Sequence, residues 1–307
     1  MQIYSFYICR TKFSVHFFDD FRKTFPFYLS PNKIFRPKFD IIKSYRYLCI
    51  DRHPGFKVIT LTNFNTSKMS ILSIFRGNKA PQYPTDTIQD KEGNKLTFTF
   101  FKHASFCITL GEHNIYIDPV SEYAEYSLLP KADIVLITHS HYDHFDRAAV
   151  DDITTRHSTI ICDKTTAEAF DGEPIVMTPG TKTVVGGNIT IEAVAAYNTS
   201  EGHTDFHPQA REDCGYIITL DSDTRIYIAG DTEPTPEMLA LTDIDIAFLP
   251  VNQPYTMTVN QAVEAVKAIR PKIFYPYHYG EVEEKTDIER LKRELEGITD
   301  VRVFPME

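Results

Sequence analysis

The sequence predicts an α/β fold in which β-sheets lie between helices. Two patterns indicate this class. Short apolar strands joined by tight turns occupy the middle of the chain, and strands alternate with helices in its last third. Hairpins followed by strand–helix alternation are typical of sheets covered by helices. With 307 residues and 42% hydrophobic content, the chain has the composition of a soluble globular protein with one large or two small domains.

A sharp change in composition divides the chain near residue 68. Residues 1–68 hold 12 Lys and Arg, 4 Asp and no Glu, a net charge of +8, whereas the whole chain carries −10 and the remainder therefore −18. The same segment holds 16 of the 39 aromatic residues and shows no sustained periodicity. We therefore expect a basic, aromatic N-terminal extension over residues 1–68 and an enzyme domain over residues 69–307.

Three explanations fit this extension. It is a basic aromatic arm for nucleic acid or an anionic membrane surface, or an unrelated small domain, or it does not belong to the native protein, since Met69 would serve as an initiator. The compositional break favours the third, and we expect the segment to be disordered or absent from the native protein. No signal peptide pattern or membrane-spanning apolar run is present.

Regular elements are predicted from residue 96 onward, after a polar, irregular lead-in that begins at residue 70. Alternating or continuous apolar runs predict strands at residues 96–101, 106–110, 115–117, 134–137, 159–162, 175–177, 191–197, 214–220, 225–229, 244–251, 273–275 and 301–304. Helices are predicted after a capping Asp146 as far as residue 153, and at residues 164–170, 236–241, 259–269 and 286–295.

One stretch, IVLITHSHYDHFD at residues 134–146, carries the strongest chemical signal. A strand buried on both faces ends abruptly in His139, His141, Asp143 and His144. Side chains of this kind crowded together would leave buried polar groups unpaired, so a cation is expected among them. His139 and His141 would converge on one ion, while the following turn carries Asp143 and His144 towards a second ion. Zinc suits imidazole and carboxylate ligands, with manganese or iron as alternatives.

Other polar residues share this position at the end of a strand. Asp118, His139, Asp231 and His278 each follow an apolar strand directly, and His103 lies in the link between the first two predicted strands. In sheets covered by helices, ligands bind in the crevice beyond the strand ends. The sequence therefore predicts one site built from residues that are far apart along the chain.

These motifs resemble a known superfamily. The run THSHYDH, with Asp118 before it and AGDT and PYHYG after it, resembles the metallo-β-lactamase-fold hydrolases. The segments HASF, IDP and LPVNQPYTM look most like the ascorbate-6-phosphate lactonase-like branch. The resemblance spans about residues 96–280 and the tail, and none of residues 1–68. It implies a four-layer αββα sandwich with a dinuclear metal site at one edge.

The resemblance also implies a role for each motif residue. His139 and His141 would bind the first metal, and Asp231 would bridge both metals. Asp118 would orient a ligand histidine. The second metal would be bound by Asp143, His144 and His278.

The chain departs from the family pattern at the third ligand of the first metal. Many members have a histidine directly after the strand that ends here at residue 197, where this chain has Asn198. We expect Asn198 just outside the ligand set and a loop histidine in its place. His207, between Phe206 and Pro208, has a restricted backbone, whereas His203 lies in a flexible context. We therefore prefer His207 and keep His203 as the alternative.

The expected activity is hydrolysis of a small ester, lactone or phosphodiester by a hydroxide that bridges two divalent metal ions. Asp143 or Asp231 would accept a proton, and His103 would contact the developing oxyanion. Rim tyrosines are alternatives to His103, or else pack with satisfied hydroxyls; they are Tyr255, Tyr277 and Tyr279.

Four other functions compete with hydrolysis of a small substrate. A nuclease would need a basic groove, against which the net −18 argues. A di-iron flavoprotein would be expected to have Glu where His141 stands. A mononuclear iron dioxygenase and a metal-binding sensor on an inactive scaffold remain as alternatives. We expect a small-molecule substrate and no nucleic acid, and leave a homo-oligomer open.

The cysteines and one further acidic residue also carry information. Cys107, Cys162 and Cys214 lie in predicted strands, so buried free thiols and a reducing cytoplasm are expected. Glu233 follows Asp231 closely and could be an extra carboxylate, but the nearby Pro234 and Pro236 favour a residue at the start of a helix.

Overall fold

The computed structural model describes residues 3–8, 11–16, 49–51, 59–60, 81–172, 174–280 and 285–307, and it divides the chain into two compact units, Met1–Lys79 and Ala80–Glu307. Strands of the first unit form an antiparallel sheet in the order β1 (Ile3–Ile8), β2 (Thr11–His16), β3 (Cys49–Asp51) and β4 (Ile59–Thr60). The expected domain start at Met69 lies outside the described residues. Disorder or absence of residues 1–68 in the native protein stays a prediction.

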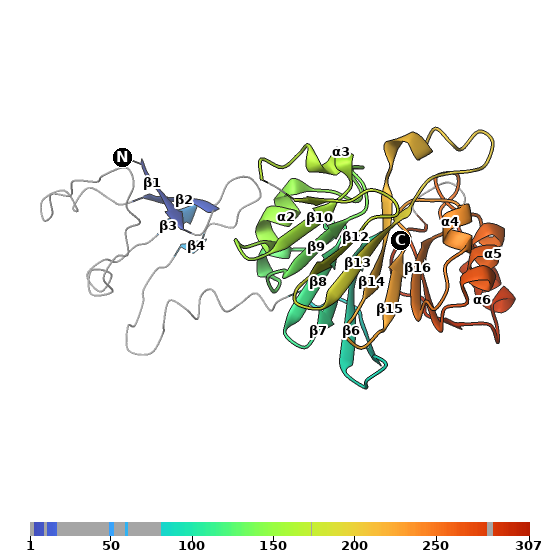
Figure 1. Ribbon diagram of the computed structural model, residues 1–307. Coiled ribbons are helices and arrows are strands. Elements are labelled where there is room, and N and C mark those ends of the chain that lie inside the picture. The colour runs from blue at the N-terminus through green and yellow to red at the C-terminus, as the bar shows by residue number, and fades with distance from the viewer. Residues whose placement is uncertain are drawn as a thin grey trace, which may run out of the picture. The chain divides into compact units, whose positions relative to one another are not determined.

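The second unit contains two seven-stranded mixed sheets (Figure 1). The first sheet runs in the order β11 (Ile175–Val176), β10 (Thr159–Cys162), β9 (Ile134–Ile137), β8 (His113–Ile117), β7 (Ser105–Leu110), β6 (Lys95–Lys102) and β5 (Thr85–Gln89). The second runs in the order β12 (Lys182–Val185), β13 (Ile189–Ala195), β14 (Cys214–Thr219), β15 (Arg225–Ile228), β16 (Ile246–Pro250), β17 (Ile273–Tyr277) and β18 (Asp300–Val301).

Helices cover the outer faces of both sheets. On the side of the first sheet they are α2 (Arg147–Ile153), α3 (Lys164–Ala167) and the 3₁₀ turn η3 (Tyr126–Leu128), and on the side of the second they are α4 (Pro236–Leu239), α5 (Val259–Ile269) and α6 (Ile288–Glu294). A further 3₁₀ turn, η4 (Gln209–Arg211), lies in the loop before β14. The predicted αββα sandwich is confirmed. Within the described part of the chain, no helix has the length and hydrophobicity needed to cross a bilayer.

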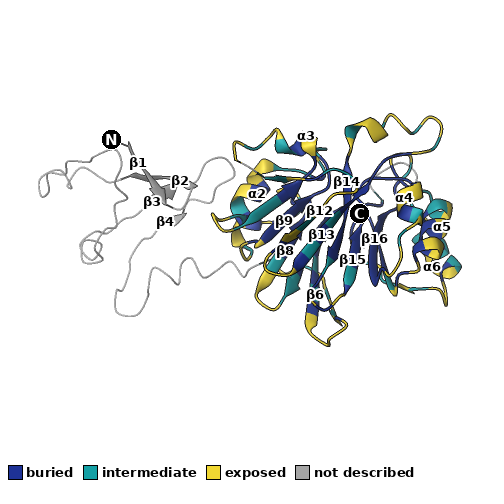
Figure 2. Cartoon of the chain, viewed as in Figure 1, coloured by how far each residue is buried: buried dark blue, intermediate teal, exposed yellow. Residues whose placement is uncertain are grey.

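Strand β9 shows how the sequence builds these four layers. Its four residues are all buried, and alternate side chains point to opposite faces. Ile134 and Leu136 join the core between the two sheets, while Val135 and Ile137 pack with the buried face of α2. Figure 2 shows both sheets buried and the outer faces of the helices exposed. A continuous apolar run is therefore the pattern that a strand between two cores requires.

Most predicted elements are present with slightly different ends. Residues 159–162 and 259–269 form the predicted strand and helix at the predicted bounds. The irregular lead-in expected up to residue 95 is wrong at residues 85–89, where β5 pairs with β6 along the edge of the first sheet. Its side chains are only half buried at best, so no apolar pattern announces it.

Strand directions bring the site residues to one edge. Strands β8 and β9 are parallel, and β6 runs in the same direction because two antiparallel pairings separate it from β8. In the second sheet, β15, β16 and β17 are parallel, and β13 runs the same way. The carboxyl ends of these strands therefore deliver their following residues to one edge of each sheet.

The close approach of β14 and β15 depends on a glycine. A Cβ atom on Gly215 would lie 2.5 Å from the backbone oxygen of Ala229 and 2.8 Å from that of Ile228. Both atoms belong to the paired strand and its end, so they cannot move aside without disturbing the sheet. We expect Gly215→Ala to lower the free energy of unfolding by about 1–3 kcal/mol, measured by denaturant titration. At Gly172 a Cβ would meet no atom within 4 Å, so Gly172→Ala is the control. Equal midpoints for the two variants would contradict this packing.

Candidate metal centre

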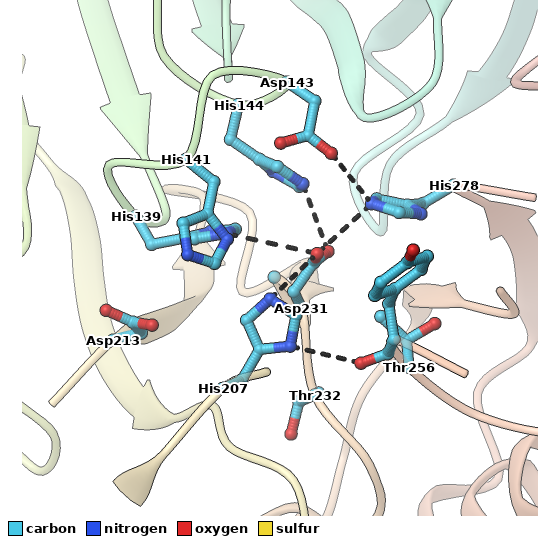
Figure 3. Close-up of polar contacts among 12 residues, drawn as sticks. His139, His141, Asp143, His144, His207, Asp213, Asp231, Thr232, Thr256 and His278 are labelled. Carbon is cyan, nitrogen blue, oxygen red and sulfur yellow. Dashed lines mark hydrogen bonds and ion pairs between the residues drawn. The ribbon is translucent and has the colours of Figure 1, made fainter. Parts of the chain in front are cut away.

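Imidazole and carboxylate groups gather around Asp231 at the shared edge of the two sheets (Figure 3). The ligand atoms of His139, His141 and His207 lie within 4.8 Å of one another, and we call these residues the first group. On the other side, the ligand atoms of Asp143, His144 and His278, the second group, also lie within 4.8 Å of one another, together with that of His103. All of the metal ligands expected from the sequence are therefore brought together.

Asp231 stands between the two groups. One oxygen, Oδ1, lies 3.1 Å from Nε2 of His144. The other, Oδ2, lies 3.2 Å from Nε2 of His278, 3.3 Å from Nε2 of His207 and 4.0 Å from Nε2 of His139. A single buried carboxylate thus faces histidines from both groups, which is the geometry of a shared ligand.

The first group joins two separate segments. Nε2 of His139 lies 3.0 Å from Nδ1 of His141, and both residues follow β9. His207 comes from the loop between β13 and β14, and its ring centre lies 5.4 Å from that of His139. His139 and His207 are buried, while His141 is partly exposed and borders solvent.

The second group is tied to the turn between β6 and β7. Oδ2 of Asp143 lies 3.6 Å from Nε2 of His278 and 3.2 Å from Nε2 of His103. The rings of His103 and His278 have centres 3.7 Å apart, and the backbone N–H of His278 donates to the carbonyl of His103. His103 is buried to 2% exposure, and its Nε2 contacts Asp143; the expected contact of His103 with the developing oxyanion stays a prediction.

Asp118 holds His144 from the outer side. The fully buried Asp118 accepts hydrogen bonds from the backbone N–H and the hydroxyl of Thr138, each at 2.7 Å. Nδ1 of His144 donates to the same carboxylate at 2.8 Å, which leaves Nε2 directed at Asp231. A buried carboxylate satisfied in this way fixes the tautomer and the orientation of the imidazole.

The backbone is strained where the strands release these side chains. His103, Asp118 and His278 have φ values of 58°, 42° and 51°, a left-handed conformation that is uncommon for residues other than glycine. Gly230, which precedes Asp231, has φ of 68° and lies close to the side chain of Thr138. Such conformations persist only where the surrounding structure enforces them. Here they lie just beyond the ends of β6, β8, β15 and β17.

Asn198 organises the loop that supplies His207. Its backbone N–H donates to the carbonyl of His207 at 2.9 Å, and its side-chain amide donates to the carbonyls of His203 and Tyr255. Nδ1 of His207 donates to the same carbonyl of Tyr255 at 3.1 Å, so its Nε2 turns towards Asp231. The residue that stands at the usual histidine position thus supports the loop histidine.

Glu233 anchors the beginning of the same loop. Its carboxylate accepts from the backbone N–H groups of Thr199 at 2.7 Å and Ser200 at 2.5 Å, and lies 3.2 Å from Nδ1 of His203. His203 is therefore engaged outside the two groups. The interpretation of Glu233 as a residue at the start of a helix is wrong, because α4 begins at Pro236 behind the capping Thr235.

Two of the three rim tyrosines are part of the core. The buried hydroxyls of Tyr277 and Tyr279 donate to the carbonyls of Gly230 and Phe304, as the packing alternative predicted. Tyr255 is 38% exposed and stacks edge-on against Phe206 at a centroid distance of 4.9 Å. The structure therefore leaves Tyr255 as the one of these three tyrosines that borders solvent.

The charges of the centre are strongly coupled. Burial raises the pKa of the Asp231 carboxyl, but His144 and His278 outweigh burial and hold that pKa well below its ordinary value. Burial lowers the pKa of His144, yet Asp231 and then Asp118 bring it well above its usual value. For His139, burial and the neighbouring His144 hold the pKa well below its usual value. The edge thus combines an ionised carboxylate with an imidazole that keeps a free lone pair.

Unsatisfied buried atoms test whether these residues fit a metal. Nε2 of His144, Nε2 of His278 and Oδ1 of Asp231 are buried and make no hydrogen bond of good geometry; their contacts are ion-pair distances of 3.1 Å from His144 and 3.2 Å from His278 to the Asp231 carboxylate. Buried polar atoms without a hydrogen bond are rare, and each calls for an explanation such as an ion. Imidazole nitrogens and carboxylate oxygens are ligands for zinc, and also for manganese or iron. The residues present therefore fit divalent metal ions.

Comparisons with known proteins agree with this geometry. A family model described as a beta-lactamase superfamily domain matches residues 97–278. A UPF0173 metal-dependent hydrolase of Thermoplasma acidophilum is 33% identical over 210 residues, 64% of this chain and 89% of that protein. Another, from Methanosphaera stadtmanae, is 32% identical over 236 residues, 69% of this chain and 98% of that protein. The solved structure of a proposed metal-dependent hydrolase from Parabacteroides distasonis is 46% identical with a TM-score of 0.68, and covers 73% of this chain and 100% of that one.

Two stacked mixed sheets with a histidine and aspartate cluster at one edge define a metal-dependent hydrolase of the metallo-β-lactamase fold. The chain belongs to the beta-lactamase superfamily and, within it, to the family of UPF0173 metal-dependent hydrolases.

The anchoring role of Glu233 can be measured directly. Glu233→Gln removes the ionised acceptor of two backbone N–H groups, which costs about 1–3 kcal/mol locally. We expect hydrogen exchange at the amides of Thr199 and Ser200 to accelerate by roughly 5- to 150-fold. Glu201→Gln alters an exposed carboxylate in the same loop and serves as the control. Unchanged exchange at both amides would show that Glu233 does not anchor the loop.

Proposed function

We propose that this protein hydrolyses small esters, lactones or phosphodiesters at a centre of two divalent metal ions, with zinc as the expected ion. The observation that carries this proposal is the position of Asp231, whose two carboxylate oxygens face imidazoles from the first group and the second group. A carboxylate that faces imidazoles of two neighbouring groups is suited to hold two cations close together.

Each group would hold one ion. The first group would offer three imidazole nitrogens, with His207 as the ligand that the loop provides. The second group would offer two imidazoles and the carboxylate of Asp143. We prefer His207 to His203 because Nε2 of His207 lies 3.3 Å from Asp231, while His203 faces Glu233.

Bound metal ions would supply Lewis acidity and make water a strong nucleophile near neutral pH. The side chains add the remaining functions. Asp143 is 18% exposed, so it can take a proton from the attacking water and release it to solvent. His103 contacts Oδ2 of Asp143, and we assign His103 to positioning that carboxylate rather than to contact with substrate. Asp231 is buried, so we assign it the role of a shared ligand rather than that of a proton acceptor.

A small substrate is supported by charge. Residues 69–307 carry a net −18, and polyanions such as nucleic acids bind chiefly to basic surfaces. Tyr255, with Phe206 packed against it, lies next to the loop of His207 and offers an apolar surface for a substrate group. Lactones and acyl esters suit this apolar surface better than a long phosphodiester chain does.

Matched glutamine variants test the ligand assignment. His207→Gln is expected to reduce the zinc content from about two ions to about one per chain, because it removes one of three imidazoles from the first group. His203→Gln is the control from the same loop and should retain both ions. Metal analysis of the purified proteins by mass spectrometry gives the stoichiometry. Loss of an ion in His203→Gln with none lost in His207→Gln would reverse the assignment.

The reaction class is tested by a screen over lactones, acyl esters and phosphodiesters. We expect hydrolysis of at least one class, loss of activity after dialysis against a chelator, and recovery when zinc is added back. Asp231→Asn should remove activity in every class, since the shared ligand is lost. Full hydrolysis by the metal-free protein would refute the proposed mechanism.

A further inference from the structure

The histidines of the two groups differ in the hydrogen-bond partner of the second ring nitrogen, the one that would not bind metal. A metal-binding imidazole normally donates its other N–H to an oxygen, which fixes the tautomer and raises the basicity of the ligating nitrogen. Four of the histidines in the two groups have such a partner: His139 has the hydroxyl of Thr138, His144 has Asp118, His207 has the carbonyl of Tyr255, and His278 has the side-chain amide of Asn252. That amide can present its oxygen by a half turn.

His141 is the exception, because the ring nitrogen that faces away from the other ligands contacts the guanidinium of Arg211. Nδ1 of His141 points at Nε2 of His139, while Nη1 of Arg211 donates to Nε2 of His141 at 2.9 Å. A guanidinium has donors and no acceptor, so Nε2 must present its lone pair. A neutral imidazole then carries its proton on Nδ1, which is the atom that faces the other ligands of the first group.

Arg211 is held firmly in this position. Its Nε donates to Asp213 at 2.9 Å and its Nη2 donates to the hydroxyl of Ser140 at 3.3 Å. Asp213 is buried to 2% exposure, so the carboxylate is not free to follow a moving guanidinium into solvent. Three partners in different directions therefore fix the plane of the guanidinium against His141.

The resulting hydrogen bonds form a continuous chain without a metal. Arg211 donates to His141, and Nδ1–H of His141 is placed to donate to Nε2 of His139. Nδ1 of His139 then lies 3.1 Å from the hydroxyl of Thr138, which donates to Asp118. To offer Nδ1 to a cation, a neutral His141 imidazole has to carry its proton on Nε2 instead, where that N–H would face the Nη1 donor of Arg211 at 2.9 Å. In the second group, by contrast, the carboxylate of Asp118 stands behind His144.

We propose that Arg211 weakens metal binding at the first group, so that the second group fills first and the first group fills only at higher metal concentration. This inference rests on the proposed dinuclear centre. Arg211 thereby becomes a positioning residue that acts through His141, and the metal concentration determines how many chains carry the complete centre.

Zinc titration of the metal-depleted full chain, in competition with a chromophoric chelator, tests the proposal. The unaltered protein should bind two zinc ions in two resolved steps, the weaker of which disappears in His207→Gln. Arg211→Gln should tighten the weaker step by about tenfold, the lower end of effects seen for residues behind metal ligands. The stronger step should not change.

Two further variants separate the role of Arg211 from side effects. Arg211→Gln combined with Asp213→Asn removes the buried carboxylate that would lose its partner, and it should tighten the weaker step as the single variant does. Arg293→Gln removes a positive charge from the exposed side of α6 and should leave both steps unchanged.

The outcomes are distinguishable. A weaker step that is unchanged or weakened in both Arg211 variants would overturn the role of Arg211 while leaving the dinuclear centre intact. Two steps of equal affinity in the unaltered protein would also overturn it. No zinc binding by the unaltered protein would instead contradict the dinuclear centre itself, and the ordering with it.

Discussion

The interaction on which the rest of the site depends is the contact of one buried carboxylate with the imidazoles around it. Asp231 lies at the end of β15 in the second sheet, while His139 and His144 follow β9 in the first. An ionised group at this depth is costly unless it is paired. The two sheets therefore have to meet at this edge in one register, and the strained residues His103 and His278 mark where that requirement acts on the backbone.

Two kinds of support surround this carboxylate. Residues that directly follow a strand are positioned by the sheet itself. The hydroxyl of Tyr216 donates to the carbonyl of Ile137, which ties the two sheets together beneath the site. The loop of His207 needs separate support, and Asn198 and Glu233 provide it through hydrogen bonds to the loop backbone. In the proposed centre, His207 from a loop thus takes the place of a histidine at a strand end, because other residues fix that loop.

The sequence predicted the fold class and the gathering of polar side chains at the strand ends, because buried apolar runs ending in polar residues are local patterns. It did not predict β5, whose half-buried side chains give no period, nor the anchoring by Glu233. Arg211 was missed for a similar reason: its contact with His141 joins residues 70 positions apart, and nothing in the loop composition indicates it. Contacts of this kind are tertiary and leave no local pattern in the sequence.

In the proposed centre, Asp231 is shared by two metal ions. Anomalous diffraction at the zinc edge, from crystals of the full chain grown with zinc, tests it most directly. We expect two anomalous peaks on either side of the Asp231 carboxylate, one beside the first group and one beside the second group. Crystals with no peak at this edge, or with peaks that do not contact Asp231, would contradict it.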